Sequence, residues 1–125
     1  MIPVFNEAGQ VVEVYGRKLR DDLRPGTPKH LYLPGPHAGV FNLGGVVEAG
    51  QREPGQREVI LCEALIDALT FWVHGFTNVT SAFGIEGFTD DILQALKASG
   101  IERVLIAYDR DEPGERAAEK LAPRL

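Results

Sequence analysis

One stretch, VLIAYDRDEPG at residues 104–114, most constrains the fold of this chain. The apolar run at 104–107 is typical of a strand that is covered on both faces of a sheet. Asp109 and Asp111 follow it, and residues two apart in extended backbone point to the same side. Pro113 suits the first turn of a helix, where its missing N–H costs nothing. The stretch therefore predicts a buried strand, a pair of carboxylates and a helix, in that order.

The carboxylate pair has two interpretations. Acidic residues before a helix commonly cap it and complement its dipole. Alternatively, two like charges held close together repel, and a divalent cation is the simplest partner that makes the arrangement favourable. Open α/β sheets also place their ligands at the carboxyl ends of their strands. A second acidic element earlier in the chain favours the metal interpretation over capping.

Strand and helix patterns alternate three times in the second half of the chain. Short β-rich runs occur at 58–62, 78–83 and 102–109, and segments with apolar residues at helical spacing occur at 63–75, 88–100 and 113–122. Such alternation is typical of a parallel sheet with right-handed crossovers. The sequence therefore predicts an α/β domain with a parallel sheet that is flanked by helices.

The first half of the chain has a different pattern. Residues 2–5 and 11–15 are β-rich and separated by a turn sequence, which predicts a hairpin, and 30–34 predicts another strand. Residues 42–56 are rich in glycine, and we expect them to form a connection without a helix. The expected organisation is a small β-rich subdomain at 1–57 followed by the α/β domain at 58–125.

The charge is distributed unevenly. Residues 1–57 carry seven Lys and Arg against six Asp and Glu, whereas residues 58–125 carry six against twelve. The excess of positive charge is tightest in residues 17–29, the basic segment. A basic segment beside an acidic lobe suits a protein that holds phosphates on one surface and metal on another, and equally suits a solvated loop. No apolar run approaches the ~20 residues of a membrane helix. With no signal-peptide pattern and a single cysteine, Cys62, we expect a soluble cytoplasmic protein.

A second acidic element lies directly after the first strand of the α/β part. Glu63 follows residues 58–62 as Asp109 follows the third strand, so both are expected at the same edge of the sheet. Asp67 lies one helical turn after Glu63, on the same face. If the two strands are neighbours, these residues and Asp111 converge. Oxygen ligands of this kind suit Mg²⁺ or Mn²⁺, with waters left for a phosphate to replace.

Three segments, CEALIDAL, SAFGIEG and YDRDEPG, resemble in order and spacing the three signatures of the Toprim domain. That domain occurs in bacterial-type primases, topoisomerases and a group of nucleases. The positions that match its signatures are Glu63, Asp67, Gly84, Asp109, Asp111 and Gly114. The resemblance implies a Toprim-like sheet with a divalent metal at its acidic edge.

The N-terminal part resembles the basic subdomain that precedes Toprim in bacterial-type primases and in their phage and plasmid relatives. In that subdomain a Gly-Arg pair and a Pro-Lys-Tyr-Leu-like segment lead into the Toprim strand. Gly16, Arg17, Lys29 and Leu31 occupy those positions, with His30 in place of the tyrosine. The resemblance covers nearly the whole chain and implies that the basic residues hold template or incoming nucleotide.

The chain departs from the family pattern in four respects. Ala64 replaces a glycine after the glutamate, adding a methyl group where the backbone normally approaches the site, and Pro113 replaces an alanine. Toprim domains normally continue with another strand beyond the third helix, where this chain ends. The zinc ribbon that usually precedes the primase core also has no counterpart, because one Cys and three scattered His cannot supply it. We therefore expect a fragment or a reduced gene product.

The resemblance implies DNA primase activity, that is, template-directed synthesis of short RNA primers from nucleoside triphosphates. The implied metal ligands and catalytic residues are Glu63, Asp109 and Asp111, with Asp67 as a further ligand. Glu63 is either a metal ligand or a general base.

The implied DNA and nucleotide contacts are Arg17, Lys18 and Lys29, and a helicase, fused or recruited, is a possible partner. A metal-dependent Toprim nuclease and a non-catalytic nucleic-acid-binding module are the alternatives. His37 lies in a turn sequence where it could contact nucleotide, although turn residues usually serve only the turn.

Overall fold

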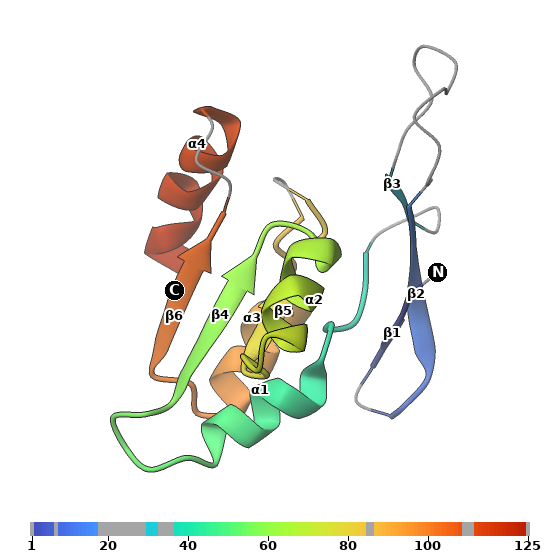
Figure 1. Cartoon of the computed structure of the whole chain (residues 1–125). Coiled ribbons are helices and arrows are strands. Elements are labelled where there is room, and N and C mark those ends of the chain that lie inside the picture. Colours follow the sequence, from blue (N-terminus) through green and yellow to red (C-terminus); the bar gives the residue numbers. More distant parts are fainter. Residues whose placement is uncertain are drawn as a thin grey trace, which may run out of the picture.

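The computed structural model describes residues 2–6, 8–17, 30–32, 37–84, 87–108 and 112–124. An antiparallel sheet formed by the N-terminal strands lies beside an α/β part that contains a parallel sheet (Figure 1). The strands are β1 (Ile2–Phe5), β2 (Val11–Arg17), β3 (His30–Tyr32), β4 (Glu58–Cys62), β5 (Val79–Ser81) and β6 (Arg103–Ala107). The helices are α1 (Leu43–Gly50), α2 (Leu65–Val73), α3 (Asp90–Ala98) and α4 (Glu112–Leu121), followed by a 3₁₀ turn, η1 (Ala122–Arg124). The predicted α/β fold class is confirmed.

The N-terminal hairpin is confirmed. β1 and β2 pair antiparallel, with Ile2 opposite Tyr15, and β3 adds to the other edge of β2. The side-chain carbonyl of Asn6 accepts hydrogen bonds from the N–H groups of Ala8 at 3.0 Å and Gln10 at 2.9 Å. This local bonding is how asparagine stabilises a turn, and it explains why the chain reverses between the two strands.

The parallel sheet has the strand order β5-β4-β6. Cys62 at the end of β4 is in register with Ser81 of β5 and with Ala107 of β6. The carboxyl ends of the three strands therefore meet at one edge, as parallel pairing requires. The first and third strands of this part are thus neighbours, which is the condition under which the residues that follow them lie at one edge.

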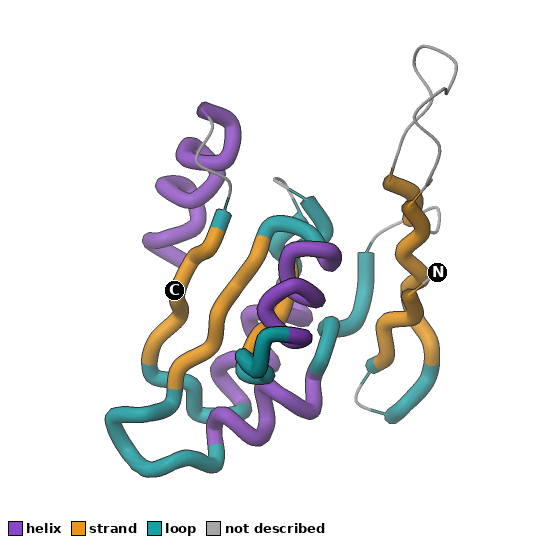
Figure 2. Tube along the Cα trace, in the orientation of Figure 1, coloured by secondary structure: helices purple, strands orange, loops and turns teal. Residues whose placement is uncertain are grey.

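The two faces of β4 bury different sets of residues. Val59 and Leu61 point into a core that includes residues of α1, α3 and α4. Ile60 and Cys62 point the other way and pack with Ala68 of α2. This period-two alternation lets the central strand be buried on both sides, with helices covering each face (Figure 2).

The helix α1 corrects the prediction that no helix occurs before residue 58. Its sequence, LGGVVEAG, contains three glycines, which disfavour a helix in isolation. Tertiary packing overrides that preference, because the helix buries Val46 and Ala49 completely. A Cβ at Gly45 would collide with the carbonyl oxygen of Thr77, and one at Gly50 with that of Ser99. The glycines therefore permit close packing of α1.

Asn42 fixes the start of α1. Its backbone is left-handed, with φ 55°, which asparagine tolerates better than most residues. Its side-chain amide donates to the carbonyl oxygens of Thr77 at 2.8 Å and Val79 at 2.9 Å. These bonds attach the segment before α1 to β5, so α1 belongs to the packing of the parallel sheet. The division of the chain at residues 57 and 58 stays a prediction.

The predicted helices of the α/β part are confirmed, with ends that follow their sequence signals. The hydroxyl of Thr89 caps α3 by accepting from the N–H of Ile92 at 3.4 Å. Gly75 after α2 and Gly100 after α3 have positive φ, as helix-terminating glycines commonly do.

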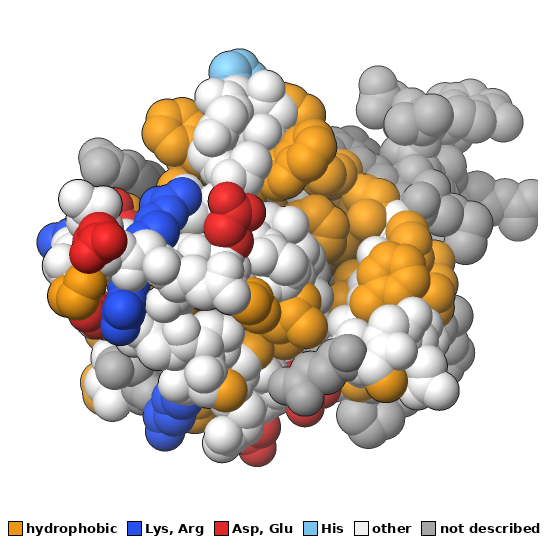
Figure 3. Space-filling model, turned by 90° about the horizontal axis from the view of Figure 1, so that it is seen from below, with side chains coloured by type: hydrophobic (Ala, Val, Ile, Leu, Met, Phe, Trp, Pro, Cys, Tyr) orange, Lys and Arg blue, Asp and Glu red, His pale blue; other side chains and the backbone are white. Residues whose placement is uncertain are grey.

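Hydrophobic side chains also gather on part of the surface (Figure 3). A groove of about 400 Å³ separates the N-terminal hairpin from α2, and the large side chains at its rim include Phe5 and Trp72, both nearly half exposed. Among the helices that the structure describes, none is long and apolar enough to cross a membrane.

Candidate functional site

The candidate site lies where the strands of the parallel sheet end. Glu63 directly follows β4 and Tyr108 directly follows β6, and the preceding residues, Cys62 and Ala107, are register partners. Glu63 and Tyr108 therefore occupy equivalent places on neighbouring strands. Asp67 lies in the first turn of α2, the helix that begins two residues after Glu63.

The glycine loop, residues 82–84 and 87, follows β5 and lies at the same edge of the sheet, on the opposite side of β4 from β6. The N–H of Ala82 donates to the carbonyl of Cys62, and the N–H of Gly84 donates to the carbonyl of Glu63, both at 2.9 Å. Gly84 has φ +97°, a conformation that L side chains rarely adopt. The signature glycine is thus required by backbone conformation, and its N–H ties the loop after β5 to Glu63.

Two buried groups show how the carboxylates act on this edge. The pKa of Tyr108 is raised to about 12, mainly by burial and further by the nearby carboxylate of Glu63 and by Cys62. Burial and then the carboxylate of Asp67 raise the pKa of the Cys62 thiol to about 12. Both groups are therefore protonated at neutral pH. The thiol is fully buried, which agrees with a core position and not with a nucleophile.

The hydroxyl of Tyr108 is a buried polar atom without a hydrogen-bond partner in the described structure. Such groups are rare in folded proteins, because an unsatisfied buried hydroxyl costs about 1–3 kcal/mol. The carboxyl end of β6, beside Glu63, therefore has a polar group whose hydrogen-bonding capacity is not used within the described structure.

The carboxylates that the structure describes at this edge are ligands of the kind that a hard divalent cation prefers. Glu63 and Asp67 provide carboxylate oxygens at the junction of β4 and α2, and Mg²⁺ prefers such ligands. Among the described residues, no group of three or more His, Cys, Asp or Glu side chains could hold a metal ion. Asp109 and Asp111, the other two predicted ligands, lie outside the described residues.

The remaining predicted site residues are spread over the molecule. Arg17 is the last residue of β2, and Gly114 is a buried residue in the first half of α4. Lys18 and Lys29 lie outside the described residues. Ala64, the departure from the family glycine, has φ −133°, which any L residue adopts, so its methyl group imposes no backbone strain.

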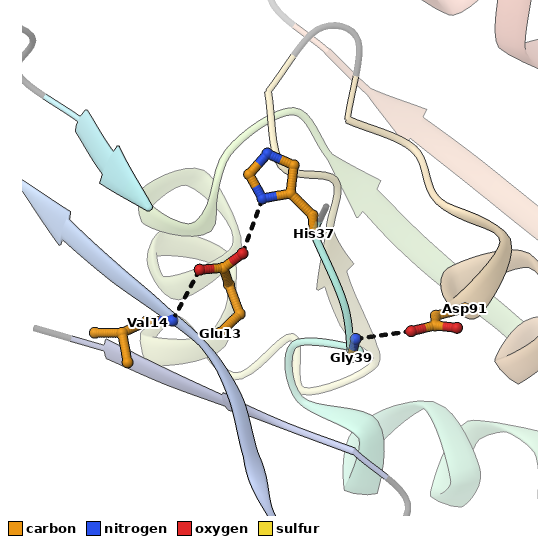
Figure 4. Close-up of polar contacts among 5 residues, drawn as sticks. All are labelled: Glu13, Val14, His37, Gly39 and Asp91. Carbon is orange, nitrogen blue, oxygen red and sulfur yellow. Dashed lines mark hydrogen bonds and ion pairs between the residues drawn. The ribbon is translucent and has the colours of Figure 1, made fainter. Parts of the chain in front are cut away.

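Sequence reasoning missed a group of side chains that meet beside the glycine loop. Glu13 on β2 is 1% exposed, and its Oε2 lies 2.9 Å from Nδ1 of His37 (Figure 4). The His37 ring stacks on Phe83, with centroids 4.8 Å apart and planes 10° apart. The signal that could have found Glu13 was strand alternation, since Glu13 shares the inward face of β2 with buried Tyr15. A turn histidine distant in sequence gave no hint of its partner.

Residues 60–125 match the model of the Toprim-like family. This chain belongs to that family. Among curated relatives, the DNA primase of Listeria monocytogenes is 32% identical over 130 residues, covering all of this chain and 20% of the relative. The chain thus spans about a fifth of the length of the curated primases that it matches.

Solved primase structures share the fold. The zinc-binding and RNA polymerase domains of the Aquifex aeolicus primase superpose with a TM-score of 0.73, at 24% identity, covering 99% of this chain and 30% of that one. A DnaG primase catalytic domain bound to single-stranded DNA superposes with a TM-score of 0.69, at 26% identity, covering 94% of this chain and 36% of that one. The N-terminal sheet and the α/β part thus both correspond to regions of primase catalytic cores.

Proposed function

We propose that this chain carries the metal-binding part of a primase-type site, which joins ribonucleotides on a single-stranded DNA template. The observation that carries the proposal is the common edge where Glu63 follows β4, Gly84 follows β5 and Tyr108 follows β6. Membership of the Toprim-like family and similarity to DNA primases over the whole chain support it. The curated primases are about five times as long as this chain, so the participation of the chain in a primase reaction is itself part of the proposal.

In this proposal Glu63, Asp109 and Asp111 hold Mg²⁺ or Mn²⁺, with Asp67 as a further oxygen ligand. A bound divalent ion would neutralise the phosphates of the nucleotide and orient them. Glu63 alternatively accepts a proton from the attacking hydroxyl, for which a carboxylate within hydrogen-bond reach is needed. The Glu63 carbonyl already accepts from Gly84, so the backbone that carries the carboxylate is held in place.

The nucleic acid would approach along the N-terminal sheet. Arg17 ends β2, and Lys18 and Lys29 belong to the same basic segment of the sequence. Positive side chains of this kind neutralise phosphates without reading sequence. The similar primase domain that was solved with single-stranded DNA supports a template of that type.

The test is incorporation of labelled ribonucleotides on a single-stranded template, by the whole protein that contains this chain. We expect Asp109→Asn to abolish incorporation, and Asp90→Asn, in the first turn of α3, to leave it unchanged. Full incorporation by Asp109→Asn would contradict the proposal. Metal-dependent cleavage without incorporation would favour the nuclease, and template binding without either reaction would favour the binding module.

A further inference from the structure

The carboxylate of Glu13 is a buried charge on the N-terminal sheet. Its Oε1 accepts from the N–H of Val14 at 3.1 Å, and its Oε2 is bonded to Nδ1 of His37 at 2.9 Å (Figure 4). Burial of a carboxylate is costly unless it is paired and hydrogen-bonded, so this contact holds the imidazole strongly. The bond joins residues 24 positions apart.

The backbone that carries His37 is fixed independently of its ring. The N–H of Gly39 donates to Oδ2 of Asp91 on α3 at 2.9 Å, and the N–H of Val40 donates to the carbonyl of Phe5 at 3.4 Å. A Cβ at Gly39 would lie 2.6 Å from the side chain of Val12, so this segment packs directly on β2. Residues 37–40 are thus held between the N-terminal sheet and α3.

From His37 the contacts continue to the sheet edge. The ring lies flat against Phe83, at 4.8 Å between centroids, and Phe83 immediately precedes Gly84. The N–H of Gly84 then bonds the carbonyl of Glu63. Offset or parallel aromatic contacts of this kind restrict where a ring can move. A continuous path of contacts therefore runs from buried Glu13 through His37 and Phe83 to the backbone of Glu63.

We propose that His37 is a positioning residue: fixed by Glu13, its ring holds the Phe83–Gly84 segment and thereby the backbone of Glu63. It acts through that segment and does not contact the reacting atoms. For metal affinity the inference rests on the proposed function, since Glu63 is the ligand that would be positioned. Groups that orient metal ligands influence affinity in this way without touching the ion.

The test compares His37→Gln with a matched control, His74→Gln. Glutamine keeps an amide that can bond Glu13 but removes the ring from Phe83. His74 is exposed at the end of α2, where its Nδ1 contacts the carbonyl of Thr70. We expect His37→Gln to shift the backbone NMR signals of Gly84 and Glu63, and the control to leave them in place. We also expect Mn²⁺ affinity at Glu63 to fall about tenfold, the lower end for substitutions around metal ligands.

A double variant separates positioning from loss of folding. Glu13→Gln with His37→Phe removes the buried charge and keeps a ring on Phe83, so we expect it to restore the signals of Gly84 and Glu63 and the Mn²⁺ affinity. Unchanged signals at Gly84 and Glu63 in folded His37→Gln would overturn the inference. Failure of the double variant to restore them would also overturn it. If the unsubstituted chain binds no Mn²⁺, the proposed function fails, and the amide signals alone decide the role of His37.

Discussion

The N–H of Gly84 donates a 2.9 Å hydrogen bond to the carbonyl oxygen of Glu63, joining the loop after β5 to the end of β4. The bond brings together two residues that match separate Toprim signatures and lie 21 positions apart in sequence. It also explains the glycine, because the backbone there has φ +97°. The position of the glutamate therefore depends on the conformation of the loop on the neighbouring strand.

Gly84→Ala is expected to strain the loop and disturb Glu63. A Cβ at Gly84 would meet no atom within 4 Å, so the whole effect comes from the backbone conformation. We expect a loss of about 1–2 kcal/mol in the free energy of unfolding, measured with urea. Gly75→Ala is the matched control, with φ +94° and equally open space after α2. Both should lose similar stability, but only Gly84→Ala should shift the amide signal of Glu63. Equal shifts in both variants would contradict this account.

The glycines of α1 should respond in opposite directions. Gly44 has open space around a Cβ and ordinary helical backbone, so Gly44→Ala should stabilise the chain by about 0.5–1 kcal/mol. Gly45→Ala and Gly50→Ala place a methyl group against the carbonyls of Thr77 and Ser99, so both should destabilise by about 1–3 kcal/mol. Urea unfolding of the three variants checks this order. Stabilisation by Gly50→Ala would show that α1 does not pack closely on α3.

The same helix shows where sequence reasoning reached its limit. The apolar run at 58–62 predicted a strand buried on both faces, and β4 confirms it. The same prediction for residues 104–107 is wrong, because β6 lies at the edge of the parallel sheet among the described strands and Leu105 is 43% exposed. The helix α1 was taken for a connection, because local propensity disfavours glycine. Its glycines allow the backbone of α1 to approach Thr77 and Ser99, which are distant in sequence. A close contact between backbone segments that are distant in sequence leaves no pattern in the residues of α1 itself.

Alkaline pH should destabilise the protein through two buried groups. The pKa of Cys62 is raised from 9.0 to about 12, and that of Tyr108 from 10.0 to about 12. The unfolded chain therefore releases these protons at lower pH than the folded chain, and the free energy of unfolding should fall as pH rises from about 9 to about 12. Below pH 9 both groups are protonated in both states, and their contribution is constant.

Tyr108→Phe isolates one of these contributions. The variant loses a buried hydroxyl without a partner in the described structure, so at neutral pH it should be as stable as the parent or more stable by about 1 kcal/mol. The difference in the free energy of unfolding between the variant and the parent should grow above pH 10. Only the parent has Tyr108, which ionises more readily in the unfolded chain than in the folded one. Urea unfolding at several pH values measures this difference. A difference that stays constant up to pH 12 would show that Tyr108 is not protected from ionisation.

The candidate site was only partly accessible to sequence reasoning. Glu63 and Gly84 lie at the predicted edge, because parallel strands must end together. For Glu13 the signal was strand alternation alone, which conflicts with the usual exposure of a glutamate in a strand. Phe83 gave no signal, since a phenylalanine after a strand is usually part of the core. Their connection through His37 depends on how the two sheets pack, which the sequence pattern does not specify. The functions of Asp109 and Asp111 stay predictions.

Binding of single-stranded DNA should depend on salt through the basic segment. Each of Arg17→Ala, Lys18→Ala and Lys29→Ala should reduce the slope of log affinity against log salt by about 0.7 for every phosphate that the original side chain neutralises. Arg52→Ala, an exposed cation after α1, is the control and should leave the slope unchanged. Fluorescence anisotropy at several salt concentrations measures these slopes. An equal effect of all four substitutions would indicate general charge attraction without a defined basic surface.

The most direct test of the central claim is titration of the chain with Mg²⁺, followed through backbone NMR signals. The claim is that Glu63, Asp67 and the acidic pair after β6 form one metal site. It predicts saturable shifts at Glu63, Asp67 and Tyr108 that disappear in Asp109→Asn and persist in Asp90→Asn. Absence of saturable shifts at these positions, or identical shifts in Asp109→Asn, would contradict it.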